Sequence, residues 1–371
     1  MHTGLSEKFG IEYPVFGFTP SEHVAAAISR AGGLGVLGCV RFNDPEELEA
    51  VLSWMDDNTD GKPYGVDIVM PAKIPTEGTS VDLESLIPEE HRAFVDRTLS
   101  ELGVPPLDTG TEHATGVLGW LHSVARSHVD VALNHRIALI ANALGSPPKD
   151  VIDQAHAKGV PVAALAGAVE HARRHVANGV DIVIAQGYEA GGHTGEIASM
   201  VLVPEIVDAV GDSAAVLAAG GIGSGRQVAA ALSLGASGVW MGSYWLTTSE
   251  YKLGGASSDG PSAIQRALLG ATSADTVRSR IYSGKPARLL KTKWTDAWSK
   301  PEAPAPLPMP LQNLLVSDAH QRIAASENPD VVAMPVGQIV GRMNEIRPVS
   351  EVMEELVSGF DSAVSRLDSY K

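Results

Sequence analysis

The sequence holds one cysteine, Cys39, among 371 residues, and it is poor in basic residues. A single cysteine excludes an internal disulfide and any metal site built from several cysteines. Lys and Arg number 28 against 44 Asp and Glu, so the net charge is −16. Nucleic acids and anionic membranes attract basic surfaces, so we expect neither as a partner. The low cysteine content is also consistent with a cytoplasmic protein.

Long apolar segments are missing as well. Residues 1–8 lack the apolar stretch of a secretory signal peptide. The uncharged stretch 227–249 is interrupted by Gly235, Gly238 and Gly242, and it is too broken for a membrane-spanning helix. With 44% hydrophobic and 19% charged residues, the composition is that of a soluble globular protein.

What the sequence does contain is an alternation of short apolar runs and longer alanine-rich stretches, typical of an α/β fold with a parallel sheet. The predicted strands are 13–18, 34–37, 65–69, 137–142, 160–165, 181–185, 215–219 and 238–241. The predicted helices include 21–31, 45–56, 149–158, 168–178, 204–210 and 225–234. Eight βα units suit a closed ring, so we predict a TIM (β/α)8 barrel, with an open doubly wound sheet as the alternative.

The regular spacing fails over residues 72–134, which we interpret as an inserted lid or subdomain with helices near 88–101 and 111–134. The barrel then comprises residues 1–71 and 135–260.

A second irregular part, 261–371, is predicted to be a C-terminal helical extension packed on the barrel. Within it, the proline-rich residues 300–310 predict an extended polyproline II strap, with an SH3-type ligand as the less favoured alternative.

Two glycine-rich segments follow the predicted sixth and seventh strands. They are residues 185–195, AQGYEAGGHTG, and residues 218–225, AAGGIGSG; a third element, VWMGS at 239–243, closes the next strand. Glycine-bearing turns after the last strands of a barrel form the usual phosphate site of this fold. Because His193 lies among the glycines, we predict a bound phosphorylated cofactor with an acid/base group beside it.

These segments resemble the nitronate monooxygenase family, formerly called 2-nitropropane dioxygenases, whose members are FMN-dependent barrel proteins. Further matching motifs lie at 25–35, 62–66, 229–239, 283–288 and 336–341. The likeness covers most of the chain outside residues 72–134.

The resemblance implies a set of FMN-binding positions at the carboxyl ends of the strands. These are Gly17, Phe18, Thr19, Asp67, Gln186, Gly191, Gly192, Gly220, Gly221, Trp240, Met241, Gly242 and Ser243. The phosphate would lie between the turn 220–223 and the pair Gly242 and Ser243, near the start of the helix 225–234. The alternative is that these glycines only make tight turns, which is what we expect of Gly235 and Gly238.

Two positions depart from the family pattern. Residues 16–19 read FGFT where members usually carry Ala-Pro-Met, and Asp67 stands where they usually carry Asn. A carboxylate beside the electron-rich edge of a flavin is unfavourable. Asp67 therefore either donates a hydrogen bond as a neutral acid, or the flavin sits differently.

His193 is the predicted catalytic residue. By the resemblance it is the base that takes the α-proton of a nitroalkane; the alternative is that it only shapes the loop. Glu189 is expected to be structural and to tie down the glycine loop, and Gln338 is a weaker candidate for contact with the flavin from the tail.

Other clusters point to packing or solvent. His171 and His175 have a spacing that suits a metal, but no acidic third ligand is evident, so we expect an exposed helix face and no metal site. His91 and His113 are expected to be solvated. Four aromatic residues are expected to pack in the core: Tyr244, Trp245, Trp294 and Trp298.

The predicted function is therefore an FMN-dependent oxidation of alkyl nitronates with O₂ to a carbonyl compound and nitrite. The alternative enzyme is an NAD(P)H-dependent flavin enoyl reductase acting on acyl-CoA or acyl-ACP, with residues 72–134 forming a cleft for the acyl chain. A non-catalytic FMN-binding protein is the third hypothesis. The substrate is expected to be a small molecule, and a homodimer is possible.

Overall fold

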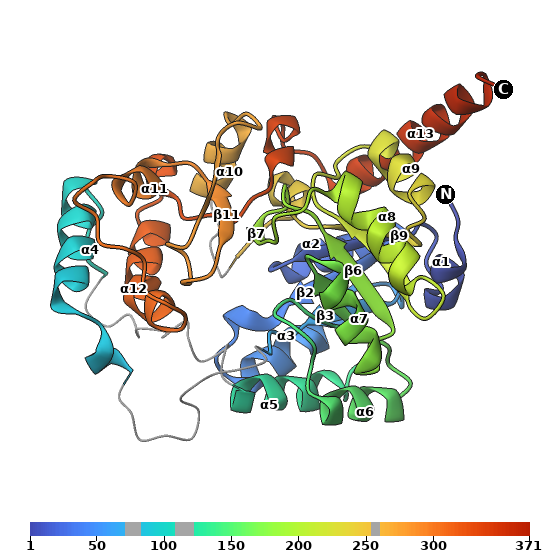
Figure 1. Ribbon diagram of the computed structural model, residues 1–371, viewed down its shortest axis with the longest axis horizontal. Helices are drawn as coiled ribbons and strands as arrows, with labels where there is room; N and C mark the ends of the chain where they lie inside the picture. Colours follow the sequence, from blue (N-terminus) through green and yellow to red (C-terminus); the bar gives the residue numbers. More distant parts are fainter. Residues whose placement is uncertain (71–82, 108–121, 254–259) are drawn as a thin grey trace.

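The structure, a computed structural model, describes residues 1–70, 83–107, 122–253 and 260–371. Eight parallel strands form a closed barrel in which β1 pairs with both β2 and β9 (Figure 1). This closure confirms the predicted TIM barrel and excludes the open sheet. The strands are β1 (Val15–Thr19), β2 (Leu34–Gly38), β3 (Tyr64–Asp67), β4 (Ile137–Asn142), β5 (Val162–Ala166), β6 (Ile182–Gln186), β8 (Ala215–Ala219) and β9 (Gly238–Met241).

Helices surround this barrel on the outside. They are α2 (Glu22–Arg30), α3 (Pro45–Asn58), α5 (His122–Ala132), α6 (Lys149–Ala157), α7 (Val169–Ala177), α8 (Ser199–Val210) and α9 (Gly225–Ser233). A further helix, α1 (Gly4–Phe9), instead packs Leu5 and Phe9 against the interior cluster of the barrel. The predicted start of α8 at residue 204 was wrong, because Pro204 lies inside the helix. A proline there removes one backbone bond, to the carbonyl of Met200, in a turn where the Met200 side chain is 69% exposed.

Side chains alternate along the strands between the barrel interior and the surrounding helices. Phe16, Leu34, Leu139 and Ile184 belong to one cluster that fills the interior, whereas Val66 packs with the helical layer. Since neighbours on a strand face opposite ways, Asp67 lies on the interior side of β3.

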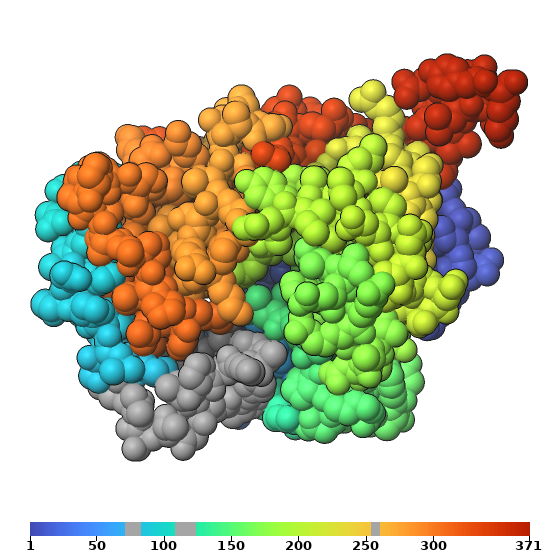
Figure 2. Space-filling model, in the orientation of Figure 1, coloured from blue at the N-terminus to red at the C-terminus, as the bar shows by residue number. Residues whose placement is uncertain are grey.

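The C-terminal part forms a second lobe beside the barrel mouth. It contains α10 (Ala263–Leu269), β10 (Thr276–Ser279), β11 (Ala287–Leu290), α11 (Lys293–Ala297) and α12 (Leu311–Ala325), and residues 298–310 join α11 to α12 without helix or strand. The polyproline II assignment for that connection stays a prediction. In Figure 2 the orange atoms of this lobe lie against the green atoms of the barrel loops.

The last helix, α13 (Val349–Asp368), returns to the barrel and packs on α9 and α2. Its approach to α9 is so close that a Cβ at Gly225 would overlap the backbone N of Phe360. Figure 1 shows the far end of α13 standing clear of the barrel.

The two helices of the predicted insertion pack in different places. Ala125 and Val129 of α5 lie in the barrel's outer core with α3, whereas Phe94 of α4 (Glu89–Glu101) packs against Trp298 of the second lobe. Residues 111–121, also expected to be helical, lie outside the described residues. The domain boundaries and the lid role stay predictions.

None of the helices in the described ranges combines the length and the hydrophobicity that a membrane-spanning segment needs.

Candidate active site

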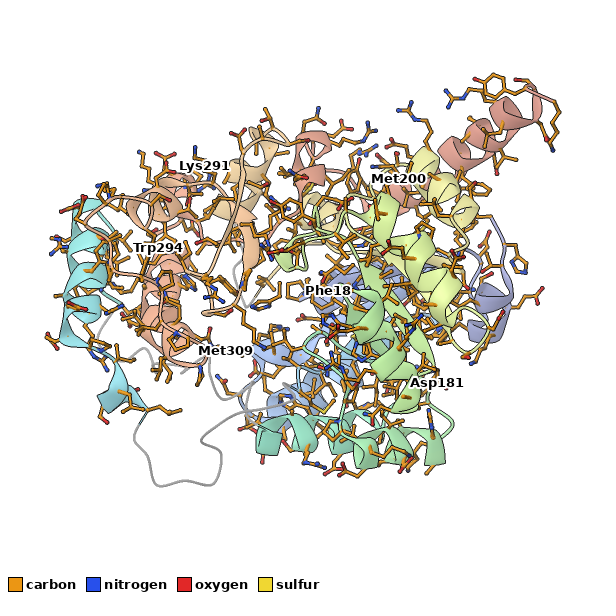
Figure 3. The ribbon with its side chains drawn as sticks, in the orientation of Figure 1. Phe18, Asp181, Met200, Lys291, Trp294 and Met309 are labelled. Carbon is orange, nitrogen blue, oxygen red and sulfur yellow. The ribbon has the colours of Figure 1, made fainter. Side chains whose placement is uncertain are left out.

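The carboxyl ends of the barrel strands face the second lobe. Figure 3 labels Phe18, at the end of β1, on the side toward α11 and α12, and Asp181, directly before β6, on the far side. The Phe18 ring stacks on Trp240 at 6.1 Å between centroids, and a Cβ at Gly38 would lie 3.0 Å from Phe18 Cε2. One face of the barrel mouth is therefore aromatic.

His193 is held at this mouth by the second lobe. The short strand β7 (Gly192–His193) pairs antiparallel with β11, with His193 opposite Ala287. Sheet β10-β11-β7 thus ties the glycine loop to a segment about a hundred residues later. The imidazole position depends on this pairing as much as on the barrel.

Two arginines of that sheet fix the same loop. Arg288, 3% exposed, donates from Nε and Nη2 to the Tyr188 carbonyl at 3.2 and 3.1 Å. Arg278 donates from Nη2 to the Thr194 carbonyl at 3.0 Å. Both guanidinium groups also lie over the Tyr188 ring, at 4.5 and 5.6 Å from its centroid. The loop is therefore clamped on both sides of His193.

The imidazole shares a short hydrogen bond with Ser283, Nε2 to Oγ at 2.6 Å. Ser283 is fully buried. Burial lowers the pKa of His193 to about 4, with a smaller contribution from the positive charge of Lys285. His193 is consequently neutral at pH 7, the form that can accept a proton. Ser283 was missed as a site residue: the motif 283–288 was recognised, but only the tertiary structure brings it to His193.

The turn after β8 has the backbone that a phosphate site requires. Gly220 and Gly221 have φ of 102° and 68°, a region that other residues rarely adopt. Glu189 lies against this turn, and its carboxylate accepts bonds from the backbone N–H and the hydroxyl of Ser199. This confirms the structural role predicted for Glu189.

The turn after β9 lies next to the tail of the chain. Ser243 Oγ accepts a hydrogen bond from the N–H of Gly337 at 2.9 Å, which leaves its own proton available to donate. A Cβ at Gly242 would meet nothing closer than 3.6 Å. Gln338 reaches the glycine loop through its backbone N–H, which donates to the Glu189 carbonyl at 2.9 Å.

Several predicted cofactor residues have packing roles. A Cβ at Gly17 would lie 2.5 Å from Ile28, and one at Gly191 would lie 2.7 Å from Gly337 N. Met241 belongs to the outer core, and its carbonyl accepts from Trp245 Nε1 at 2.8 Å. Such residues can reach a ligand only through their backbones.

The remaining predicted residues lie nearby. Thr19 is buried, and its hydroxyl accepts from the Ser21 N–H at 3.1 Å, while Gln186 ends β6 and Gly192 lies in β7. A Cβ at Gly192 would meet nothing within 4 Å. The cofactor contacts of the whole set stay predictions.

Two histidine predictions were wrong. His91 is 6% exposed and its Nε2 bonds the Ala305 carbonyl at 3.0 Å, because α4 packs under the second lobe. His175 is also buried, between the Ser146 hydroxyl and the Leu165 carbonyl. A helix face that looks polar in sequence is thus covered by neighbouring loops.

Other expectations about side clusters can be compared directly. The four aromatic residues Tyr244, Trp245, Trp294 and Trp298 are buried, as predicted. The described part of the chain contains no group of His, Cys, Asp or Glu arranged to bind a metal. His113 lies outside the described residues.

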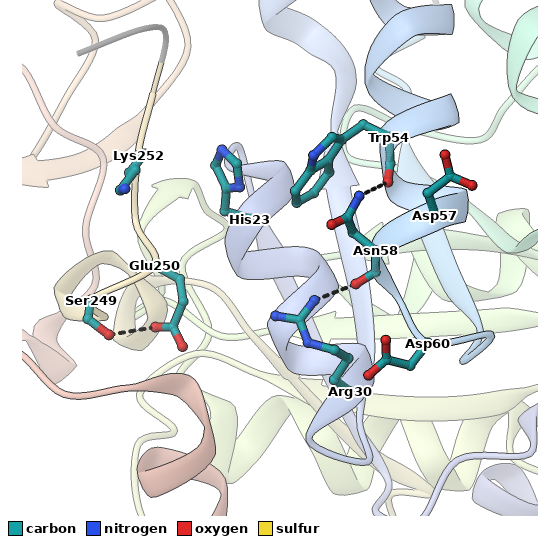
Figure 4. Close-up of a pocket in the computed structure, with 9 residues that line it drawn as sticks. All are labelled: His23, Arg30, Trp54, Asp57, Asn58, Asp60, Ser249, Glu250 and Lys252. Atoms are coloured by element: carbon teal, nitrogen blue, oxygen red, sulfur yellow. Dashed lines mark hydrogen bonds between the residues drawn. The ribbon is translucent and has the colours of Figure 1, made fainter. Parts of the chain in front are cut away.

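A separate cavity of about 480 Å³ opens between α2, α3 and residues 249–252 (Figure 4). The His23 and Trp54 rings meet edge to face on one side of it, 4.6 Å between centroids. Arg30 and Glu250 lie farther along the same cavity, so its wall carries both signs of charge. None of the predicted site residues lines it, and we assign it no part in the chemistry.

The chain matches the family model described as nitronate monooxygenase over residues 2–359. The chain belongs to the nitronate monooxygenase family. Membership confirms the resemblance and makes this protein a flavin-dependent oxidoreductase.

Curated relatives agree with this assignment, and solved structures share the fold. The Mycobacterium tuberculosis protein Rv1533, provisionally named a monooxygenase, is 48% identical over 380 residues, covering 99% of this chain and 98% of the relative. A probable nitronate monooxygenase of Staphylococcus haemolyticus is 28% identical across 95% of each chain. Nitroalkane oxidase from Streptomyces ansochromogenes has the same fold, with a TM-score of 0.79 at 24% identity over 98% of this chain and 99% of that one. FabK from Thermotoga maritima aligns over the full length of both chains, with a TM-score of 0.74 at 25% identity.

The residues of this nitronate monooxygenase family member fit a phosphorylated flavin. The positive-φ glycines after β8, the start of α9 and the Ser243 hydroxyl offer donors for a phosphate. Asp67 offers a buried carboxyl whose Oδ1 has no hydrogen-bond partner within the described ranges. An orphaned polar atom inside the barrel is what a ligand would satisfy.

Proposed function

We propose that this enzyme binds FMN in the barrel mouth and oxidises alkyl nitronates with O₂ to a carbonyl compound and nitrite. The observation that carries the proposal is the neutral imidazole of His193, held by Ser283 beside a glycine turn suited to a phosphate. FMN, when bound, supplies the redox chemistry that amino-acid side chains lack.

His193 has the properties of a base for substrates that arrive as neutral nitroalkanes. The imidazole is neutral and Ser283 holds its Nε2, so its unprotonated ring nitrogen can accept the α-proton of the substrate. A nitronate is already deprotonated and does not need this step. The enzyme should therefore use His193 for nitroalkanes far more than for nitronates.

Anaerobic mixing tests the proposal against the reductase alternative. Flavin bleached by propionate 3-nitronate, and unchanged by NADH or NADPH, supports nitronate oxidation. Bleaching by NADH or NADPH alone would replace the proposal with an enoyl reductase, a function named for one structural neighbour, the enoyl reductase domain of MlnA from Bacillus amyloliquefaciens.

A flavin-binding protein without catalysis gives a third pattern. Gly221→Val would then abolish flavin binding, because valine is strained at φ 68° and would contact Glu189 too closely. His193→Asn would leave the release of nitrite the same as in wild type. Release of nitrite, measured with each variant and with wild type, separates this pattern from catalysis. A cytoplasmic location and a homodimer stay predictions.

A further inference from the structure

Asp67 is the last residue of β3, on the interior side of the barrel at the end where the strands face the second lobe. It pairs in register with Gly38 on one side and Ala141 on the other, neither of which offers a polar side chain. The side chain is 3% exposed, and Oδ1 has no hydrogen-bond partner among the residues that the structure describes.

The surroundings of Asp67 disfavour a negative charge. Within the described ranges it forms no ion pair with an arginine, lysine or histidine. Burial raises the pKa of Asp67 to about 7, even though a hydrogen bond from the backbone N–H of Ala143 acts to lower it. In the part of the chain that the structure describes, the titratable group coupled to Asp67 is the buried Cys39 thiol. Burial also raises the pKa of this thiol, so it stays neutral.

Such a carboxyl does not stabilise the fold. A buried polar atom without a partner costs free energy, and an ionised buried carboxylate without a cation costs more. Native proteins keep such groups where a ligand satisfies them. The barrel mouth is the region where the proposed FMN would lie, so the natural partner is the flavin ring.

We propose that Asp67 binds the isoalloxazine of the flavin as an un-ionised carboxylic acid that donates its proton to a ring oxygen or nitrogen. The inference rests on the proposed FMN site and adds a pH dependence of flavin affinity. Flavin affinity falls as the pH rises and Asp67 ionises, because a carboxylate can no longer donate and its charge repels the electron-rich ring edge.

If Asp67 instead accepted a hydrogen bond from the flavin, the pH dependence of flavin affinity would have the opposite sign. An ionised Asp67 that accepted a bond from the ring imide N–H would hold flavin more tightly at high pH. The direction of the pH dependence therefore decides between the two.

The test measures the FMN dissociation constant by fluorescence quenching from pH 5.5 to 8.5. Three proteins are compared: wild type, Asp67→Asn, which is neutral and nearly isosteric at every pH, and Asp212→Asn, a matched change at an exposed turn. We expect the wild-type constant, divided by that of Asp67→Asn, to rise toward tenfold per pH unit above the midpoint. The ratio cancels the second ionisation of the FMN phosphate, near pH 6. Asp212→Asn should follow wild type.

A second measurement needs only the wild-type protein. Calorimetry of FMN binding at pH 8 in buffers of different ionisation enthalpy should show uptake of up to one proton. This result tests whether Asp67 binds flavin in its un-ionised form even if Asp67→Asn does not fold. Parallel profiles for wild type and Asp67→Asn, proton release on binding, or affinity that rises with pH overturns the role of Asp67 while the FMN site stands. Failure of FMN to bind any of the proteins at any pH overturns both.

Discussion

His193 shows how two neighbours change the chemistry of one residue. In water an imidazole is half protonated near pH 6.5, but here burial and Lys285 lower its pKa to about 4. Ser283 holds one ring nitrogen at 2.6 Å. The base is thus deprotonated and oriented before a substrate arrives.

Replacing His193 by Asn should lower kcat/KM for a neutral nitroalkane by about 10²–10⁴-fold and change the rate with a nitronate far less. Equal losses on nitroalkane and nitronate would contradict the assignment of His193 as base.

Ser283→Ala should lower the rate with a nitroalkane by roughly tenfold, because the hydrogen bond that positions the imidazole is lost.

The pH profile of wild-type kcat/KM should be flat near neutrality and fall below about pH 4, since protonation of His193 removes the base.

At the scale of secondary structure, the glycine loop is shaped by strand pairing between distant segments. β7 is only two residues long and would not persist alone. β11 and the two arginines supply its partners, and Tyr188 lies under both guanidinium groups. The second lobe therefore acts as a support for the catalytic loop.

Arg288→Ala should loosen this loop and lower turnover while the barrel stays folded. The change leaves the Tyr188 carbonyl without its donors, at a cost of about 1–3 kcal/mol in the loop. Limited proteolysis should cut the variant within residues 187–196 faster than wild type. Lys291→Ala, an exposed change just after β11, is the matched control and should behave as wild type. Unaltered proteolysis and turnover in Arg288→Ala would argue against the clamp.

For the molecule as a whole, buried titratable groups set the response to acid. Burial lowers the pKa of both His193 and His320 to about 4, and it lowers those of His128 and His175 as well. The unfolded chain binds these protons near pH 6.5, so the native state loses stability as the pH falls from 6.5 to 4. Asp67 acts in the opposite direction, because its un-ionised form is favoured by folding.

As the pH falls, the stability lost through the histidines should exceed the stability gained through Asp67. Lowering the pKa from 6.5 to about 4 changes the free energy of unfolding by roughly 3 kcal/mol for each of His193 and His320. The raised pKa of Asp67 contributes roughly 4 kcal/mol in the opposite direction. His128 and His175 add to the loss at low pH. Urea unfolding should thus give a smaller free energy at pH 4.5 than at pH 7. His320→Phe, which keeps an aromatic ring stacked on Tyr282, should reduce the difference. A variant with the same pH dependence as wild type would show that His320 does not carry it.

The features that could be predicted from the sequence are local: the eight strands, most of the helices, and the glycine turns after β6, β8 and β9. These follow from periodicity and from backbone conformations that only glycine adopts easily, so neighbouring residues are enough to reveal them. The tertiary structure decided the partnership of Ser283 with His193, the pairing of β7 with β11, the burial of His91 and His175, and the attachment of α5 to the barrel. Each of these joins segments far apart in the chain, and no local pattern records which distant surface covers a residue.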